Sequence, residues 1–97
     1  MAYQFRVLKT GFHNAFYNMG LDQAILEAVA AARVPPTLRF YGWQPPAISI
    51  GYFQGMEEEV DVAACKTHGV DTVRRITGGG AVFHQSEVTY SIALPLD

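Results

Sequence analysis

The stretch that decides the fold is RRITGGGAVFH, residues 74–84. It places two positive charges and a hydroxyl group beside three consecutive glycines, between segments that both have the pattern of β-strands. An anionic group can approach backbone N–H donors closely at glycine, because glycine has no side chain. The stretch therefore predicts a loop between strands that binds a phosphate or acyl-phosphate group. The alternative is a purely structural turn, since glycine-rich turns between strands are common.

The two arginines are expected to have different roles. Neighbouring residues of a strand point to opposite faces, so Arg74 and Arg75 cannot both address the same group. Arg75 lies on the same face as Thr77, and a guanidinium can grip a phosphate or carboxylate through two N–H groups. We expect Arg75 to bind and Arg74 to support, while a surface pairing with an acidic residue is the alternative for either one.

The glycine loop does not match the standard nucleotide-binding motifs. It lacks the Lys-Ser/Thr ending of a Walker loop and the G-x-G-x-x-G spacing before a helix, so the spacing alone names no nucleotide. His84, directly after the loop, could bind a ligand or orient the loop, or it could be a structural histidine.

Length and composition indicate one small globular domain. The chain has 97 residues, of which 49% are hydrophobic and 16% are charged, unlike a disordered segment. The net charge of −2 gives no attraction toward nucleic acid, so we expect no nucleic-acid partner.

The single cysteine, Cys65, argues against a disulfide framework and against a zinc site. We expect it to be a structural residue on the inward side of a short helix. The acidic run Glu57–Glu59 is interpreted as a solvated helix start, and no metal ligands are predicted. The sequence shows no leader and no apolar stretch near the length of a membrane span, which predicts a cytoplasmic protein with no membrane partner.

The patterning predicts an α+β fold. A helix is expected from Asn14 or Asn18 to about Arg33, because apolar residues recur at spacings of three and four. A second, short helix is expected after the cap Asp61 and before Gly69. Strands are expected at residues 4–9, 37–41, 47–52 and 70–76, and residues 81–83 and 88–94 form a further strand or hairpin. In the strand at 37–41, Leu38 and Phe40 share one face while Arg39 and Tyr41 share the other.

Five segments together resemble a known family, the lipoate–protein ligase A and octanoyltransferase family of the wider biotin/lipoate ligase superfamily. They are NMGLDQA (18–24), LRFYGW (38–43), SIGYFQ (49–54), RRITGGGAVFH (74–84) and EVTYS (87–91). The resemblance spans nearly the whole chain and is to the amino-terminal part of the family's catalytic domain. The Gly-Gly-Gly-Ala-Val-Phe form is more similar to the ligases than to the octanoyltransferases.

The resemblance implies a fold, a reaction and partners. The fold is a mixed or antiparallel sheet with flanking helices, part of a class II synthetase-like catalytic domain. The ligases use ATP and Mg²⁺ to convert lipoate to lipoyl-adenylate and then pass the acyl group to a lysine of a lipoyl domain. The acceptors implied are E2 subunits and the glycine cleavage H protein.

The resemblance also implies site residues. Arg75 would contact the nucleotide phosphate, His84 would support the acyl pocket, and the residues between them would line the adenylate site. These lining residues are Gly78, Gly79, Gly80, Ala81, Val82 and Phe83. Gln85 stands where family members often have an aspartate, so a role for that acid would pass to Glu87.

No catalytic residue is predicted within the chain itself. In the family the essential lysine of the ligases, or the nucleophilic cysteine of the octanoyltransferases, follows well after the glycine motif. Residues 1–97 are therefore expected to be the incomplete amino-terminal part of a ligase-like domain, inactive alone and completed by further sequence or by a second chain of a split ligase. The alternatives are part of an octanoyltransferase that uses a thioester donor, and a non-catalytic subunit that binds an acyl-nucleotide or docks on a partner.

Overall fold

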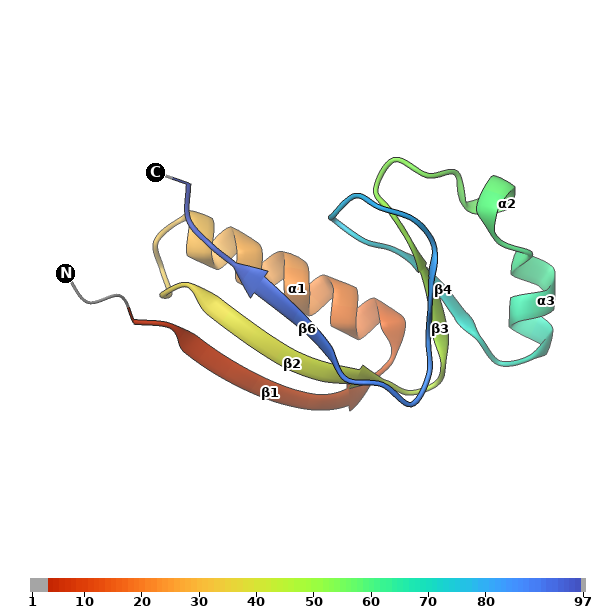
Figure 1. Cartoon of the computed structure of the whole chain (residues 1–97), viewed down its shortest axis with the longest axis horizontal. Helices are drawn as coiled ribbons and strands as arrows, with labels where there is room; N and C mark the ends of the chain where they lie inside the picture. The colour runs from red at the N-terminus through yellow and green to blue at the C-terminus, as the bar shows by residue number, and fades with distance from the viewer. Residues whose placement is uncertain (1–3, 97) are drawn as a thin grey trace.

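Two three-stranded mixed sheets form the framework of the protein (Figure 1). The computed structural model describes residues 4–96, so residues 1–3 and 97 of the expected domain lie outside it. In the first sheet β2 (Thr37–Trp43) is central, pairing in parallel with β1 (Arg6–His13) and antiparallel with β6 (Thr89–Ala93). The predicted α+β class with a mixed sheet is confirmed.

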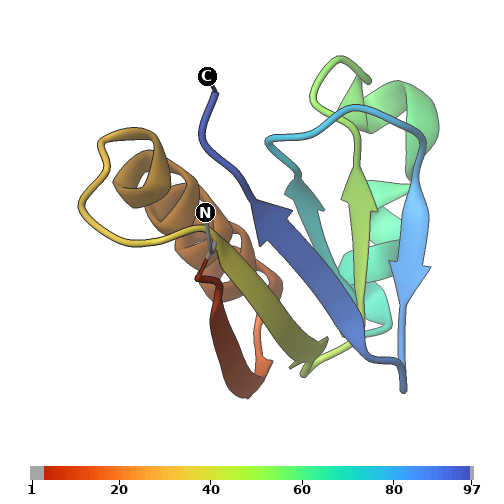
Figure 2. The same ribbon diagram turned by 60° about the vertical axis from the view of Figure 1, so that its left-hand side comes forward.

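The second sheet has the same pattern, with a central strand that has one parallel and one antiparallel neighbour. Here β3 (Ala47–Ile50) is central, between β4 (Asp71–Arg74) and β5 (Val82–His84). Figure 2 shows the chain crossing from β5 of this sheet to β6 of the other. The two strands predicted after the glycine loop are therefore confirmed, but the hairpin alternative is wrong, because each strand pairs in a different sheet.

The long helix α1 (Ala15–Ala30) packs on one face of the first sheet. It begins at the cap Asn14, whose side chain accepts a hydrogen bond from the Tyr17 N–H at 2.8 Å. Its Ile25 and Val29 form an apolar cluster with Ala93 of β6. The predicted helix is confirmed with Asn14 as the cap, while its end lies about three residues before the expected one.

Two short helices cover the second sheet: α2 (Met56–Glu59) and α3 (Val62–Thr67). Asp61 caps α3 by accepting from the Ala64 N–H at 3.0 Å, as the sequence predicts. The three glutamates of α2 are exposed, and Cys65 is buried in a cluster with Ile50 and Val60. Neither α1 nor these short helices is long and apolar enough to span a membrane.

Burial along β2 gives the fold an unusual feature. The predicted alternation is confirmed, but the face turned toward α1 is the one that carries Thr37, Arg39 and Tyr41, all buried. Arg39 has 0% of its surface exposed, which is rare for a charged residue unless it is paired. A polar cluster therefore lies between α1 and the first sheet, beside the candidate site.

Candidate functional site

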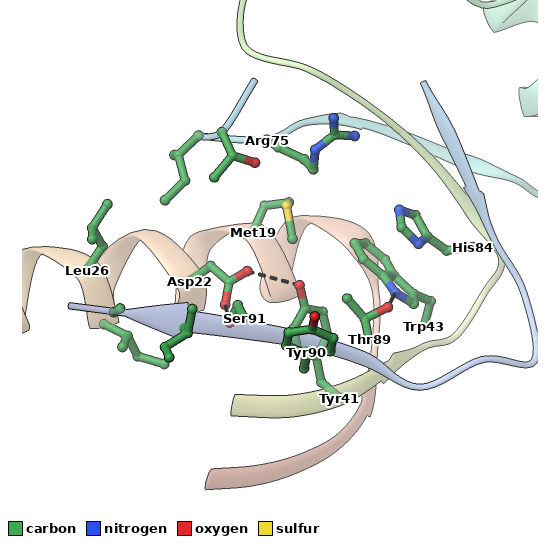
Figure 3. A pocket seen from close by; sticks show the side chains of 15 residues that line it. Met19, Asp22, Leu26, Tyr41, Trp43, Arg75, His84, Thr89, Tyr90 and Ser91 are labelled. Atoms are coloured by element: carbon green, nitrogen blue, oxygen red, sulfur yellow. Dashed lines mark hydrogen bonds between the residues drawn. The ribbon is translucent and has the colours of Figure 1, made fainter. Parts of the chain in front are cut away.

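A groove of about 330 Å³ lies between α1, β6 and the chain that follows β4 (Figure 3). One end is apolar and is formed by Ile25 and Leu26 of α1 with Ile92 and Ala93 of β6. The other end carries polar and aromatic side chains, namely Trp43, Arg75, His84 and Thr89. Leu26 and the pair Trp43 and His84 lie at opposite ends of the view in Figure 3. The groove has the form expected of a site for a molecule with an apolar chain and a polar head.

Arg75 lies at the polar end and is held by the backbone around it. Its Nη1 donates to the Ser49 carbonyl at 3.2 Å and to Ser49 Oγ at 2.7 Å. Its Nη2 donates to the carbonyl oxygens of Gly78 and Gly80, both at 2.8 Å. The Nε–H is thus the guanidinium donor without a partner in residues 4–96. Arg75 therefore shapes the glycine loop and also presents a positive charge to the groove.

Arg74 points the other way and supports a different loop. Its Nη1 donates to the carbonyl oxygens of Gly51, Tyr52 and Gln54, which follow β3. Arg74 therefore supports a loop, as expected. Ligand binding by Arg75 stays a prediction.

The glycine loop is open to solvent. Gly78, Gly79 and Gly80 are exposed, and within the described part of the chain their N–H groups donate no hydrogen bond. Gly79 has φ of 93°, a conformation that favours glycine. An added Cβ at Gly51 would overlap the Gly79 carbonyl, so Gly51 permits the close approach of loop and strand. Exposed backbone donors beside an arginine fit an anionic group.

The structure brings together some of the predicted site residues and separates others. Arg75 and His84 both line the groove. The other predicted site residues lie on the exposed loop and on β5, outside the groove lining: Gly78, Gly79, Gly80, Ala81, Val82 and Phe83. The site thus has two parts, an apolar groove and a neighbouring loop of backbone donors, with Arg75 between them.

His84 is buried, with 5% of its surface exposed, and has three close neighbours. Its ring stacks on Trp43 with centroids 4.1 Å apart, its Nε2 is 2.8 Å from Ser49 Oγ, and its Nδ1 is 3.3 Å from Glu87 Oε1. The pattern of the sequence does not indicate the contact with Ser49, which is 35 residues from His84 along the chain. For Glu87 the sequence did give an indication, because the family resemblance suggested that it takes the role of the aspartate that Gln85 replaces.

A second cluster of polar residues, which sequence reasoning missed, lies in the middle of the groove wall. Asp22 Oδ1 accepts from Arg39 Nη1 and from Ser91 Oγ, both at 2.8 Å. Asp22 Oδ2 accepts from the Tyr41 hydroxyl at 2.9 Å, as Figure 3 shows. Arg39 also bonds Asn18, with Nη2 to Oδ1 at 2.7 Å. The available signal was Arg39, the one charged residue in the sequence of the strand Thr37–Trp43.

Burial raises the pKa of Tyr41 well above its ordinary value, and the Asp22 carboxylate raises it further through its charge and its hydrogen bond. The folded protein therefore keeps this hydroxyl protonated at a pH at which the unfolded chain loses the proton.

This shift predicts that the free energy of unfolding falls with increasing pH above about 10. The contribution is fully present below the ordinary tyrosine value of 10.0 and is lost as the pH rises toward the folded pKa. The expected slope is about 1.4 kcal/mol per pH unit for this group. Urea unfolding at a series of pH values measures this slope. The slope should be present in the parent chain and in the exposed control Tyr52→Phe. It should be absent in Tyr41→Phe. An equal slope in Tyr41→Phe would contradict the assignment.

No group of three or more histidine, cysteine, aspartate or glutamate side chains in residues 4–96 is arranged to hold a metal ion. The part of the site that the structure describes consists of the groove, the guanidinium, the imidazole and the backbone donors.

Groove and loop together place an apolar wall beside a positive charge and exposed backbone donors. In the comparison with known proteins, the model of the lipoyl protein ligase A/B catalytic domain matches residues 14–97. The chain belongs to this family.

Individual relatives include both transferases and ligases. Octanoyltransferase LipM of Moorella thermoacetica is 53% identical over 87 residues, which are 90% of this chain and 32% of that protein. A Thermoplasma acidophilum lipoate protein ligase with bound lipoic acid has 36% identity and a TM-score of 0.76, over 95% of this chain and 37% of that one. Lipoate-protein ligase A bound with ATP has 36% identity and a TM-score of 0.77, over 95% of this chain and 36% of that one.

A further structure is described as a bi-partite lipoate protein ligase and its E2 lipoyl domain from T. acidophilum, with 36% identity and a TM-score of 0.72, over 94% of this chain and 36% of that one. The chain spans about a third of the length of the relatives that it matches.

Proposed function

We propose that the chain forms the acyl-binding part of an octanoyltransferase, which moves an octanoyl group from a thioester donor to a lysine of a lipoyl domain. The observation that carries this is the groove, whose apolar end is formed by Leu26 and Ala93 and whose polar end by Arg75 and His84. A saturated acyl tail buried there would gain about 0.8 kcal/mol for each methylene removed from water. The 53% identity to octanoyltransferase LipM favours this donor over free lipoate.

The group that performs the transfer is proposed to lie in the remainder of the domain. Lys9 and Lys66, the lysines of the chain, do not line the groove, and Cys65 is buried among Ile50 and Val60. Residues 1–97 would then be the amino-terminal part of the catalytic domain. The remainder would come from further sequence or from a second chain, an arrangement that the bi-partite neighbour makes reasonable.

A second candidate is an ATP-dependent lipoate–protein ligase. The exposed, unpartnered N–H groups of Gly78–Gly80 beside Arg75 favour it, because such donors suit the charge that develops on phosphorus during adenylation. The same N–H groups would hold the nucleotide phosphates. Mg²⁺ would accompany the nucleotide, and we assign it no ligand in residues 4–96. In both candidates the acceptors are lipoyl-domain proteins such as E2 subunits and the glycine cleavage H protein.

The two candidates differ in the donor that they need. The chain is mixed with a lipoyl domain and, in parallel reactions, with the downstream portion of the Moorella octanoyltransferase or of the ATP-bound lipoate-protein ligase A. The acceptor is then weighed by mass spectrometry. Octanoyl carrier protein without ATP is expected to give an octanoylated acceptor. A product that requires ATP and free acid would identify the ligase instead. Binding of octanoate to the chain with no product from either donor would favour a non-catalytic binding subunit.

The apolar end of the groove predicts a dependence on chain length. Leu26→Trp should fill this end and lower octanoate affinity about tenfold, the equivalent of about two methylene contacts, while butanoate affinity changes less than twofold. Calorimetric titration of the chain with both acids measures this. Glu27→Trp, on the exposed side of α1, is the matched control. An equal loss for both acids in Leu26→Trp would show that the tail does not reach Leu26.

A further inference from the structure

A continuous series of polar contacts joins Glu87 to Arg75 behind the groove. Glu87 Oε1 is 3.3 Å from His84 Nδ1, His84 Nε2 is 2.8 Å from Ser49 Oγ, and Ser49 Oγ is 2.7 Å from Arg75 Nη1. The two inner members are buried, with Ser49 at 0% and His84 at 5% exposure. A carboxylate therefore stands at one end of this series and a guanidinium at the other, with a hydroxyl and an imidazole between them.

The direction of the hydrogen bonds follows from which atoms can only donate. A guanidinium N–H can only donate, so Ser49 Oγ accepts from Arg75. The Ser49 hydroxyl proton has no acceptor in residues 4–96 other than His84 Nε2. With His84 Nε2 as the acceptor of this hydroxyl proton, a neutral ring carries its own proton on Nδ1.

Glu87 is the acceptor that this Nδ1 proton needs. Nδ1 is buried and has no aligned hydrogen bond in the described chain, yet the Glu87 carboxylate is within 3.3 Å. Glu87 is fixed from the other side, because its Oε2 accepts from Thr89 Oγ1 at 2.7 Å. Thr89 in turn accepts from Trp43 Nε1 at 2.8 Å. His84 on one side and Thr89 on the other therefore face the same carboxylate.

We infer that Glu87 and Ser49 are positioning residues, which hold His84 in the Nδ1–H form and through it fix Arg75 and the glycine loop. This deepens the proposed function, because it assigns new residues to the same site. Because the Ser49 hydroxyl donates its hydrogen bond to His84, a lone pair of Ser49 Oγ is available to accept from Arg75 Nη1. Nη2 is then free to hold the carbonyl oxygens of Gly78 and Gly80. Hydrogen bonds that all run in one direction polarise and strengthen one another.

The test is the position of the ring proton, read from long-range ¹H–¹⁵N spectra of the ¹⁵N-labelled chain in mildly alkaline buffer, where imidazoles are neutral. His84 is expected as the Nδ1–H form. His13 supplies an internal reference of the opposite form, because its Nε2 is 2.8 Å from the Thr10 carbonyl, which can only accept. An Nε2–H form of His84, or a doubly protonated ring, would overturn the inference without any variant.

Two substitutions test whether Glu87 and Ser49 position His84 and Arg75. Glu87→Gln keeps the size but can turn an N–H₂ donor toward the ring, so the Nδ1–H form of His84 is expected to fall to a mixture. Ser49→Ala removes the donor to Nε2 and is expected to weaken octanoate binding about tenfold. Glu57→Gln makes the same chemical change on exposed α2 and should alter neither signal. An unchanged His84 spectrum in Glu87→Gln would contradict the positioning role.

Measuring octanoate binding together with the His84 spectrum separates the proposed function from the inferred order of hydrogen bonds. If the parent chain shows the Nδ1–H form of His84 but does not bind octanoate, the proposed function fails while the order of the hydrogen bonds stands. If octanoate binds and His84 is in the Nε2–H form, the order of the hydrogen bonds fails and the proposed function stands.

Discussion

Replacement of Asp22 with alanine is expected to lower the free energy of unfolding by about 3–5 kcal/mol. Arg39 has no exposed surface and would lose its carboxylate partner, which leaves a buried guanidinium charge uncompensated. Ser91 and Tyr41 would lose their shared acceptor at the same time. Because small domains are stable by only about 5–15 kcal/mol, a large part of the stability would be lost. Urea unfolding followed by circular dichroism measures the difference.

Two variants separate the unpaired charge from other effects of the substitution. Asp22→Ala combined with Arg39→Met removes both charges and should recover a good part of the loss, since the cost arises mainly from the buried, unpaired guanidinium. Glu27→Ala removes an exposed carboxylate from the same helix and should change stability by less than about 0.5 kcal/mol. A double variant no more stable than Asp22→Ala would show that the charge is not the main cause.

Replacement of Arg75 with alanine is expected to lower octanoate affinity about 100-fold. The substitution removes the positive charge from the polar end of the groove and also the donors that hold the carbonyl oxygens of Gly78 and Gly80. Arg75→Lys should recover little, because an ammonium on a flexible stem cannot reproduce the planar fork that spans Ser49 and the loop. Calorimetric titration of the folded variants with octanoate measures the affinities.

Arg74→Ala is the matched control, since it removes the same side chain from the neighbouring position. Arg74 supports the carbonyl oxygens after β3 and does not line the groove, so octanoate affinity should change less than about threefold. Unchanged affinity in Arg75→Ala would show that Arg75 only anchors the loop and that the acyl head binds elsewhere.

The sequence predicted the local elements well because their signals are local. Asn14 and Asp61 cap helices by bonding residues three positions away, and the alternation along residues 37–41 is a property of a single strand. It did not predict which face of β2 would be buried. Arg39 was a poor candidate for burial until Asp22 and Asn18, on a different element, supplied its partners.

The same contrast applies to the candidate site. Arg75 and His84 could be selected because they flank the glycine loop along the chain, and the structure places both on the groove. The groove itself could not be predicted, because its walls come from α1 and β6, which are separated in sequence by the whole second sheet. Ser49 was missed for the same reason, since its contact with His84 depends on the pairing of β3 with β5.

The return of the chain to its first sheet has a consequence for the order of folding. β6 follows its partner β2 by the full length of the second sheet, so this pairing closes one of the longest loops in the described residues. On the ribosome, β1, α1 and β2 emerge long before the strand that completes them. The wall that β6 contributes is therefore built only after the whole second sheet has been made, and a ligand that needs this wall would bind only chains in which β6 has paired with β2.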